Sequence, residues 1–134
     1  MSQILERTCL CFVIINEKVL LLERQNTWYE NGKYLPPGGV VDIDEEPVTA
    51  AVRELFEETG LLVDEKDLVL VHNYQNELNN LLFDNYHFIS GRCSGVATNK
   101  EPERHSNIGW FPLTNLPANT SQIVHNILNK LWTT

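Results

Sequence analysis

Three glutamates, Glu54, Glu57 and Glu58, are spaced i, i+3 and i+4, and this spacing constrains the chain more than any other feature. On an α-helix with about 3.6 residues per turn such positions lie on one face, within about 100° of one another. Like charges at this spacing repel, and Arg53 is the only base in the surrounding segment. A solvated face usually interleaves acids with several bases, so we favour a shared cation over a solvated face. Ligands that are all oxygen favour Mg²⁺, Mn²⁺ or Ca²⁺ over zinc.

Residues 46–59 carry the signals of the helix that this spacing requires. Pro47 suits a first helical turn and Gly60 is placed to end the helix. Asp44 and Glu45 precede it, where negative charge is favourable. An apolar stripe lies about a quarter turn from the acids and consists of Val48, Ala51, Val52 and Leu55. One side of the helix is therefore expected to pack into a core while the neighbouring side presents carboxylates.

The segment 39–61 resembles, at every fixed position, the signature of the Nudix hydrolases. That signature is a glycine, five residues, a glutamate, seven residues, and then Arg-Glu-aliphatic-any-Glu-Glu-any-Gly-aliphatic. The matching positions are Gly39, Glu45, Arg53, Glu54, Leu55, Glu57, Glu58, Gly60 and Leu61. The preceding Leu-Pro-Pro-Gly-Gly, residues 35–39, also resembles the family pattern, whereas Asp44 stands where many members have glycine.

The resemblance implies roles for these residues in hydrolysis of a phosphoanhydride bond. It implies one or more Mg²⁺ ions, or Mn²⁺ as a substitute, held by the carboxylates and by the carbonyl that precedes the motif; the ligands are Gly38, Glu54, Glu57 and Glu58. Glu54 is our choice for the general base or the group that orients the water. Arg53 is expected to fix the geometry of the carboxylates, and the structural positions are Gly39, Glu45 and Gly60.

A later loop offers alternative bases, because some family members use a glutamate outside the motif. The candidates are Glu101 and Glu103, and we prefer Glu103 for its distance from Trp110. The alternative for both is an acid on a solvated loop.

The apolar patterns along the chain predict one α+β domain over residues 1–134. Strands are expected at 8–15, 18–23, 68–74, 81–93 and 108–111, helices at 46–59 and 121–132, a loop at 24–34 and a polar turn at 75–80. Strands and helices do not alternate, which favours a layered α+β fold. The resemblance implies the Nudix fold, a mixed β-sheet sandwiched between α-helices.

Composition limits the partners. A net charge of −8 argues against a nucleic acid polymer, which needs basic patches, but not against a small phosphorylated substrate bridged by a cation. We find no long apolar stretch for a membrane. Three cysteines without the spacing of metal ligands favour reduced thiols in a cytoplasmic protein. Separately, the chain is expected to be a monomer or a homodimer.

Substrate contacts are harder to read from the sequence. The aromatic candidates for stacking on a base are led by Trp28, Tyr34 and Tyr86, with core packing or a place at the rim as the alternative for each; the others are Tyr29, Phe83 and Trp110. Amides that could read a base edge are Asn26, Asn73 and Asn85, with turn roles as their alternative. The four histidines form no ligand motif.

Three functions compete at this point. The piece 108–118 resembles the ending of the MutT-like branch, so the first hypothesis is a pyrophosphohydrolase of nucleoside di- or triphosphates. The second is a hydrolase of another nucleoside diphosphate linked to X, such as a nucleotide sugar, ADP-ribose or a dinucleotide. The third is a non-catalytic nucleotide-binding regulatory domain. The intact acids of the motif argue against this third function.

Overall fold

The computed structural model describes residues 4–132, so the ends of the predicted domain, 1–3 and 133–134, lie outside the described part. The described residues form strands β1 (Ile4–Ile15), β2 (Lys18–Arg24), β3 (Tyr34–Leu35), β4 (Gly38–Val40), β5 (Val69–Leu78), β6 (Leu81–Ser90) and β7 (His105–Pro112). The helices are α1 (Pro47–Thr59), the short 3₁₀ helix η1 (Glu65–Asp67) and α2 (Gln122–Trp132).

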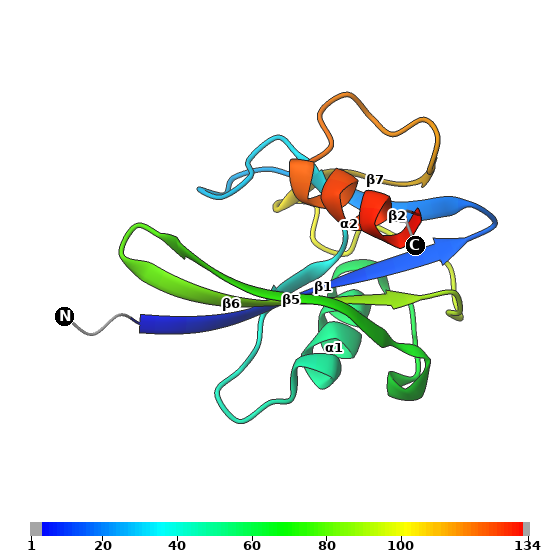
Figure 1. Ribbon diagram of the computed structural model, residues 1–134. Helices are drawn as coiled ribbons and strands as arrows, with labels where there is room; N and C mark the ends of the chain where they lie inside the picture. Colours follow the sequence, from blue (N-terminus) through cyan, green and yellow to red (C-terminus); the bar gives the residue numbers. More distant parts are fainter. Residues whose placement is uncertain (1–3, 133–134) are drawn as a thin grey trace.

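The long strand β1 joins the sheet together. It pairs in parallel with β6 from Ile4 to Val13, and antiparallel with β4 around Cys9. Its last residues pair antiparallel with β2, which in turn pairs with β3 and β7, while β5 lies antiparallel on the far side of β6. Figure 1 shows α1 on one side of this mixed sheet and α2 on the other. The predicted fold, a mixed sheet between helices, is confirmed.

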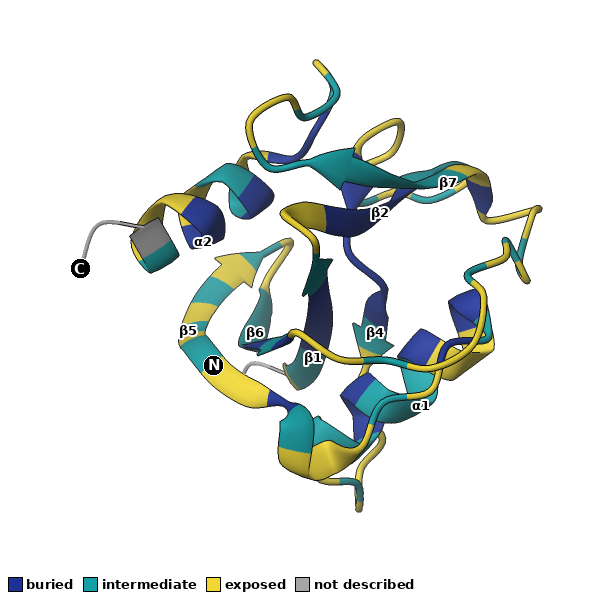
Figure 2. Ribbon diagram, turned by 90° about the vertical axis from the view of Figure 1, so that its right-hand side faces the viewer, coloured by how far each residue is buried: buried dark blue, intermediate teal, exposed yellow. Residues whose placement is uncertain are grey.

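Alternating residues of β1 supply two separate cores, because successive side chains of a strand point to opposite faces. Cys9, Cys11 and Val13 are buried in the cluster that includes α1, whereas Leu10 and Phe12 are buried in the cluster that includes α2. The buried colour of β1 and β2 in Figure 2 shows that both strands lie inside the molecule. Burial on both faces explains why residues 9–15 are apolar without a break.

Helix α1 begins and ends close to the predicted positions. Pro47 occupies its first turn, and Gly60 ends it with a φ of 81°, donating its backbone N–H to the Phe56 carbonyl at 2.9 Å. Ala50 and Leu55 are fully buried against the sheet. Glu45 lies in the loop before the helix, where its carboxylate accepts hydrogen bonds from the Asp42 N–H and from Arg53.

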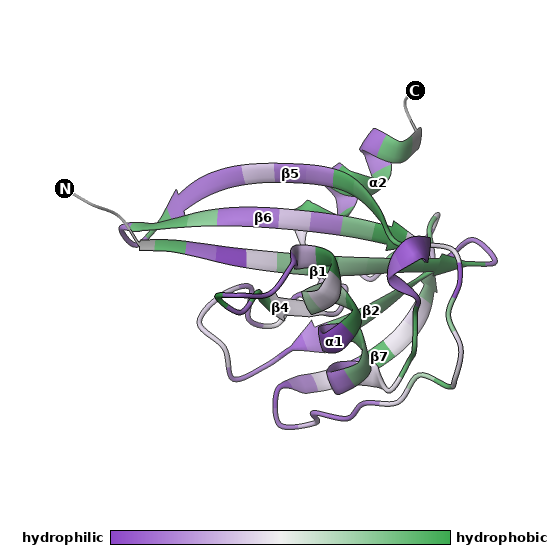
Figure 3. Ribbon diagram, turned by 90° about the horizontal axis from the view of Figure 1, so that it is seen from below, coloured by the Kyte–Doolittle hydropathy of each residue, from purple (hydrophilic) through white to green (hydrophobic). Residues whose placement is uncertain are grey.

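The predicted turn at 75–80 is wrong. Strand β5 continues to Leu78 and pairs with β6 to the end, so that the turn consists of Asn79 and Asn80 alone, with φ values of 52° and 65°. Two asparagines with positive φ suit a tight hairpin. Figure 3 shows β5 as hydrophilic over much of its length, which is why its sequence resembles a turn.

Three other predicted strands have different bounds in the structure. β1 begins at Ile4 rather than at residue 8, because β6 pairs with its whole length. β7 covers His105–Pro112 rather than 108–111, because it pairs along β2. β6 ends at Ser90, before Gly91, rather than at residue 93. The sequence did not predict the short strands β3 and β4, which exist through their pairing with β2 and β1.

Candidate active site

The acids of α1 face the backbone of β4 at very short range. The Gly38 N–H donates to Glu58 Oε1 at 3.1 Å. A Cβ atom on Gly39 would lie 2.6 Å from Glu54 Oε1, and one on Gly38 would overlap the Cys9 carbonyl oxygen. Both positions therefore need glycine, because only a residue without a side chain lets the strand approach the carboxylates and β1 so closely.

Glu54 and Glu58 are held in an environment that opposes their charge. Burial raises the pKa of Glu58 to about 8, and the neighbouring Glu54 charge adds to this effect. Burial likewise raises the pKa of Glu54 to about 7, although Arg53 acts in the opposite direction. Carboxylates whose pKa values are raised together in a cavity are typical of sites that bind a cation or handle a proton.

Arg53 compensates the other acids of the cluster. Its Nε and Nη2 atoms donate to the two oxygens of Glu45 at 2.8 and 2.9 Å, a bidentate pair. Its Nη1 donates to Glu54 Oε1 at 3.0 Å and to Glu57 Oε1 at 2.9 Å, and Nη2 also reaches the Val40 carbonyl at 3.1 Å. The structure thus brings Arg53 together with Glu45, Glu54 and Glu57, as expected for a residue that fixes carboxylate geometry.

A polar cavity of about 330 Å³ opens in front of these acids. Glu54 and Glu58 form part of its wall, together with basic and neutral polar groups from β2, the following loop and the start of β7. Those groups include Arg24, Arg104 and His105. His105 is buried, and burial lowers its pKa to about 4, so it is neutral near pH 7. The cavity therefore combines negative and positive walls, which suits a phosphate group bridged to carboxylates by a cation.

The donor set fits a hard divalent ion. Glu54 and Glu58 offer carboxylate oxygens at the cavity wall, and a cation would offset the burial, and the nearby negative charges, that raise their pKa values. Glu57 is turned toward Arg53 and is less buried, and among residues 4–132 no three His, Cys, Asp or Glu side chains converge as they stand. Glu54 and Glu58 would hold the ion, and Glu57, on the same helix face, would supply a further carboxylate.

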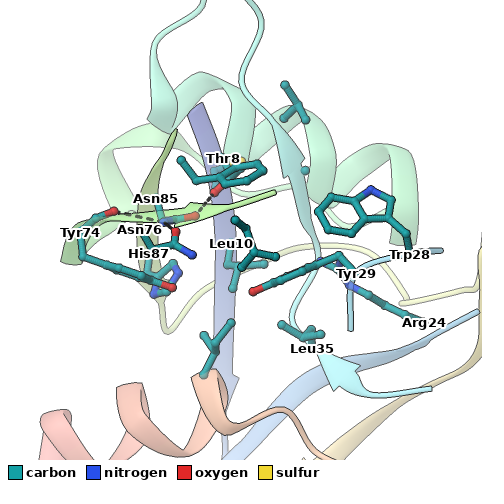
Figure 4. Close-up of a pocket in the computed structure, with 16 residues that line it drawn as sticks. Thr8, Leu10, Arg24, Trp28, Tyr29, Leu35, Tyr74, Asn76, Asn85 and His87 are labelled. Atoms are coloured by element: carbon teal, nitrogen blue, oxygen red, sulfur yellow. Dashed lines mark hydrogen bonds between the residues drawn. The ribbon is translucent and has the colours of Figure 1, made fainter. Parts of the chain in front are cut away.

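A second cavity, of about 160 Å³, adjoins the first and is largely apolar. Its floor is one face of the sheet, where alternate residues of β5 and β6 line it; these are Tyr74, Asn76, Leu78, Phe83, Asn85 and His87. The loop after β2 supplies Trp28 and Tyr29, and Figure 4 shows these rings across the cavity from Asn85. Arg24, Leu35, Gly39 and Val40 line both cavities, so the aromatic cavity and the carboxylate cavity are continuous.

The predicted substrate residues fall in different places. Trp28 lines the aromatic cavity. Tyr34 is buried in the α2 core, where its ring packs against Phe111 and its hydroxyl accepts from Asn107 Nδ2 at 2.7 Å. Tyr86 donates to Asp84 Oδ2 at 2.9 Å, and neither of these tyrosines lines either of the two cavities described.

The loop acids are also separated by the structure. Glu101 contributes to the charge that raises the pKa values of both Glu54 and Glu58. Glu103 is exposed, and its carbonyl accepts from Asn26 Nδ2 at 2.8 Å. The geometry therefore favours Glu101 over Glu103 as the loop acid nearest the site.

The sequence did not point to Arg24, Tyr74 or Asn76. Tyr74 and Asn76 lie two residues apart on β5, and a period of two would have placed them on one face had residues 75–80 been read as a strand. Arg24 carried no signal, because a single arginine after an apolar strand is common.

Comparisons with known proteins agree with this geometry. The profile of the NUDIX domain family matches residues 5–131. A MutT-like protein of Streptomyces ambofaciens is 38% identical over 60 residues, 45% of this chain and 38% of that protein. A diphosphoinositol polyphosphate phosphohydrolase 3-beta of Bos taurus is 42% identical over 53 residues, 40% of this chain and 31% of the relative. These matches cover less than two fifths of each relative's own length.

Solved structures extend the comparison to nearly the whole chain. The crystal structure of a MutT NUDIX hydrolase from Burkholderia pseudomallei matches with a TM-score of 0.86 and 26% identity, covering 95% of this chain and 98% of that one. A NUDIX hydrolase from Nitrosomonas europaea matches with a TM-score of 0.78 at 19% identity, covering 95% and 88%, which supports the fold alone.

The chain belongs to the NUDIX domain family, and the resemblance drawn from residues 39–61 is confirmed. The expectation of a single domain over 1–134 stays a prediction. Among the described residues, no helix is long and apolar enough to cross a membrane.

Proposed function

We propose that this protein is a Mg²⁺-dependent hydrolase that cleaves a phosphoanhydride bond of nucleoside di- or triphosphates and releases a nucleoside monophosphate. The observation that carries the proposal is the junction of two unlike cavities, one walled by Glu54 and Glu58 and the other by Tyr29 and Tyr74. A nucleotide has the same two parts, a phosphate chain and a planar aromatic ring. A cavity of about 150 Å³ is large enough to hold one aromatic ring.

Arg24 is suited to orient such a substrate. It lines both cavities, and its guanidinium lies 5.8 Å from the centre of the Tyr29 ring. At the junction it can bind the phosphate nearest the ribose, while Arg104 on the same polar wall can bind the outer phosphates. Two fixed cations would hold the chain in line for attack on one phosphorus atom.

A proton must leave the attacking water, and Glu54 is our choice for its acceptor. Its carboxylate lines the polar cavity in which the phosphate chain would lie, so an attacking water could reach it there. Glu101 is the second choice, because its charge acts on the same two carboxylates. Bound Mg²⁺, held by Glu54, Glu57, Glu58 and the Gly38 carbonyl, would supply neutralisation of the phosphate charge.

The aromatic cavity argues against two other functions. Its planar, apolar walls do not suit a diphosphoinositol polyphosphate, the substrate in the name of the bovine relative, since that ligand carries phosphates around a saturated ring. A regulatory domain without catalysis would not need Glu54 and Glu58 at the wall of the polar cavity, where burial opposes their charge. Hydrolysis of a nucleotide sugar or of ADP-ribose is the alternative that the two cavities leave open.

Steady-state assays with Mg²⁺ test the proposal. We expect nucleoside triphosphates to be cleaved to monophosphate and pyrophosphate with kcat/KM at least ~10-fold above that for ADP-ribose or UDP-glucose, a difference of about 1.4 kcal/mol. Equal or reversed efficiencies would move the protein to the alternative substrates. Absence of cleavage of all three substrate types with either Mg²⁺ or Mn²⁺ would overturn the proposal.

A further inference from the structure

Three polar side chains on the floor of the aromatic cavity are linked in a chain of hydrogen bonds across three strands. Thr8 of β1 donates its hydroxyl to Asn85 Oδ1 of β6 at 2.7 Å. Asn85 Nδ2 donates to Asn76 Oδ1 of β5 at 2.8 Å and to the Tyr74 carbonyl at 3.1 Å. Figure 4 shows Thr8, Asn85 and Asn76 side by side at this wall. We call these three side chains the amide relay.

The direction of the amide relay is fixed by the backbone. The Tyr74 carbonyl can only accept a hydrogen bond, so the side chain partner at 3.1 Å must be the amide nitrogen of Asn85. The other N–H of that nitrogen then meets Asn76, which must present its oxygen. The Asn85 oxygen lies toward Thr8, whose hydroxyl rotates to donate to it. A flip of either amide would set donor against donor or carbonyl against carbonyl.

The consequence is that the Asn76 amide is oriented with its oxygen toward Asn85, which leaves its nitrogen as the donor for a ligand. Its Oδ1 is engaged by Asn85, while no residue in the described range 4–132 accepts from its Nδ2. Asn85 itself has given both N–H groups to the protein and cannot read a ligand through them. Asn76, and not the predicted Asn85, is therefore the amide at this wall that still has N–H groups to donate to a base edge.

The other polar side chains of the cavity fix no acceptor, because the hydroxyls of Tyr29 and Tyr74 can rotate to donate or to accept. Of the described residues that line it, none is an aspartate or a glutamate. His87 also lines it and its Nδ1 has no hydrogen-bond partner, but a neutral imidazole can donate or accept according to its tautomer and does not discriminate. A free carboxamide recognises adenine by using its donor and its acceptor together, whereas the relay holds the Asn76 oxygen against Asn85 and leaves its Nδ2 without a protein acceptor among the described residues.

We propose that Asn76 is a specificity-determining residue that donates to a ring carbonyl oxygen, so that bases with a keto group are preferred over their amino counterparts. Thr8 and Asn85 are positioning residues that fix the Asn76 amide. The preferred class comprises nucleotides of hypoxanthine, guanine, uracil and thymine. This inference rests on the proposed function, because it assumes that a nucleobase enters the aromatic cavity.

Two pairs of substrates isolate the group in question. ITP and ATP differ in the purine ring only by a keto or an amino group with its ring proton, and UTP and CTP differ in the same way. We expect the wild-type protein to cleave the keto member of each pair with kcat/KM at least ~10-fold higher, mainly through KM. Equal efficiencies, or a preference for ATP and CTP, would overturn the inference.

Substitutions locate the effect. Asn76→Asp removes the donor with almost no change of shape and should abolish the keto preference or reverse it. Gln75→Glu is the matched control, because it introduces the same change of charge one residue away at an exposed position outside the cavity lining, and it should leave the preference intact. A keto preference that survives Asn76→Asp would overturn the assignment.

The relay is tested separately. Thr8→Val removes the hydroxyl that holds Asn85 and should reduce the keto preference, whereas Thr8→Ser keeps the hydroxyl and should restore it. A thermal melt of each variant verifies folding. Restoration by serine separates positioning by the hydroxyl from a general packing role, and equal preferences in the two variants would remove Thr8 from the relay.

Failure of the proposed function gives a different result. If no nucleotide is hydrolysed, binding of IMP and AMP is measured by calorimetry with the wild-type protein and with Asn76→Asp. Tighter binding of IMP that is lost in the variant would support Asn76 independently of catalysis. Equal binding of IMP and AMP, or binding of neither, would overturn the inference.

Discussion

Glu58 differs from its neighbours in how little of its charge the protein compensates. Arg53 donates hydrogen bonds to Glu45, Glu54 and Glu57, but Glu58 accepts from the Gly38 N–H. It is also more buried than Glu54, which explains why its pKa rises further, to about 8 against about 7. A cation in the polar cavity would therefore stabilise Glu58 most.

Replacement of the acids by glutamine is the most direct test of their role. Glu54→Gln, Glu57→Gln and Glu58→Gln keep the size of the side chain and remove the charge, and each should lower kcat by roughly 10²-fold or more, the effect of losing a positioned acid, base or charge-stabilising group. Turnover with Mg²⁺ and a thermal melt measure activity and folding.

Glu77→Gln is the control for these variants, because Glu77 is an exposed glutamate on β5 outside both cavities. Turnover like that of the wild type in both Glu57→Gln and Glu58→Gln would contradict the assignment of the metal site.

His87 makes stability depend on pH below neutrality. Burial lowers its pKa from 6.5 to about 4, so the unfolded state binds more protons between these values. The stability that the neutral imidazole contributes is present above pH 6.5 and is lost as the pH falls toward 4, by roughly 3 kcal/mol over the window. His87→Phe removes the titration, and urea unfolding of both proteins at several pH values measures the difference. We expect the wild type to lose stability relative to the variant on acidification; a difference that does not vary with pH would contradict this.

At the scale of elements, the contact between β4 and α1 builds the carboxylate wall. The two glycines of β4 serve different purposes, since a side chain on Gly38 would meet the backbone of β1, whereas one on Gly39 would meet the end of the Glu54 side chain. A backbone cannot move aside, but the end of a side chain can. Gly38 is therefore required for the fold, whereas Gly39 is required for the observed position of the Glu54 carboxylate.

Gly39→Ala should accordingly damage activity more than folding. A Cβ at 2.6 Å from Glu54 Oε1 forces that carboxylate to shift, and a displacement of about 1 Å in a catalytic group can cost roughly 10²-fold in rate. Gly91→Ala is the control, because its Cβ would meet only ordinary contacts at 3.7 Å. Measured kcat and melting temperature distinguish the two effects. A Gly39→Ala protein that keeps full turnover would show that Glu54 does not need its observed position.

Local sequence signals predicted the elements that carry them and missed those that depend on partners. Helix α1 has its own proline, glycine and apolar stripe, so it was predicted to within one residue. β3 and β4 are two and three residues long and exist only through cross-strand pairing, which a local pattern does not contain. The polar end of β5 was read as a turn for the same reason, since its hydrogen bonds go to β6.

The candidate site divides in the same way. The carboxylates and Arg53 lie within one motif, and the structure brings them together. The aromatic cavity combines residues from β1, β5, β6, the loop after β2 and α2, and of the three leading aromatic candidates only Trp28 lines it. Tyr34 and Tyr86 have the right chemistry but point to other neighbours, which depends on strand register and not on residue type.

At the scale of the whole molecule, cation binding should stabilise the fold. Without a cation, the folded state binds more protons than the unfolded state between the ordinary glutamate pKa of 4.5 and the raised values of about 7 and 8, so stability falls as the pH rises through this window. Mg²⁺ at 100 times its dissociation constant should raise the free energy of unfolding by about 2.7 kcal/mol if it binds only the native state.

Melts with and without Mg²⁺ at pH 6 and pH 8 check this prediction. The effect of a fixed Mg²⁺ concentration should be larger at pH 8, because protons compete less for the carboxylates. The double variant Glu54→Gln/Glu58→Gln is the control and should lose both the stabilisation and its pH dependence. Melts that respond neither to Mg²⁺ nor to Mn²⁺ at saturating concentration would count against the site.

The parallel pairing of β1 with β6 also sets an order of events during synthesis. Thr8 and Asn85 are partners although 77 positions separate them. At about 5–20 residues per second, roughly 4–15 s pass between the emergence of one and of the other from the ribosome. During that interval one edge of β1 has no partner strand, and an open edge invites pairing with other chains. Glu6 and Arg7 lie on this part of β1, and their charges make it a poor template for aggregation while the nascent chain waits for β6.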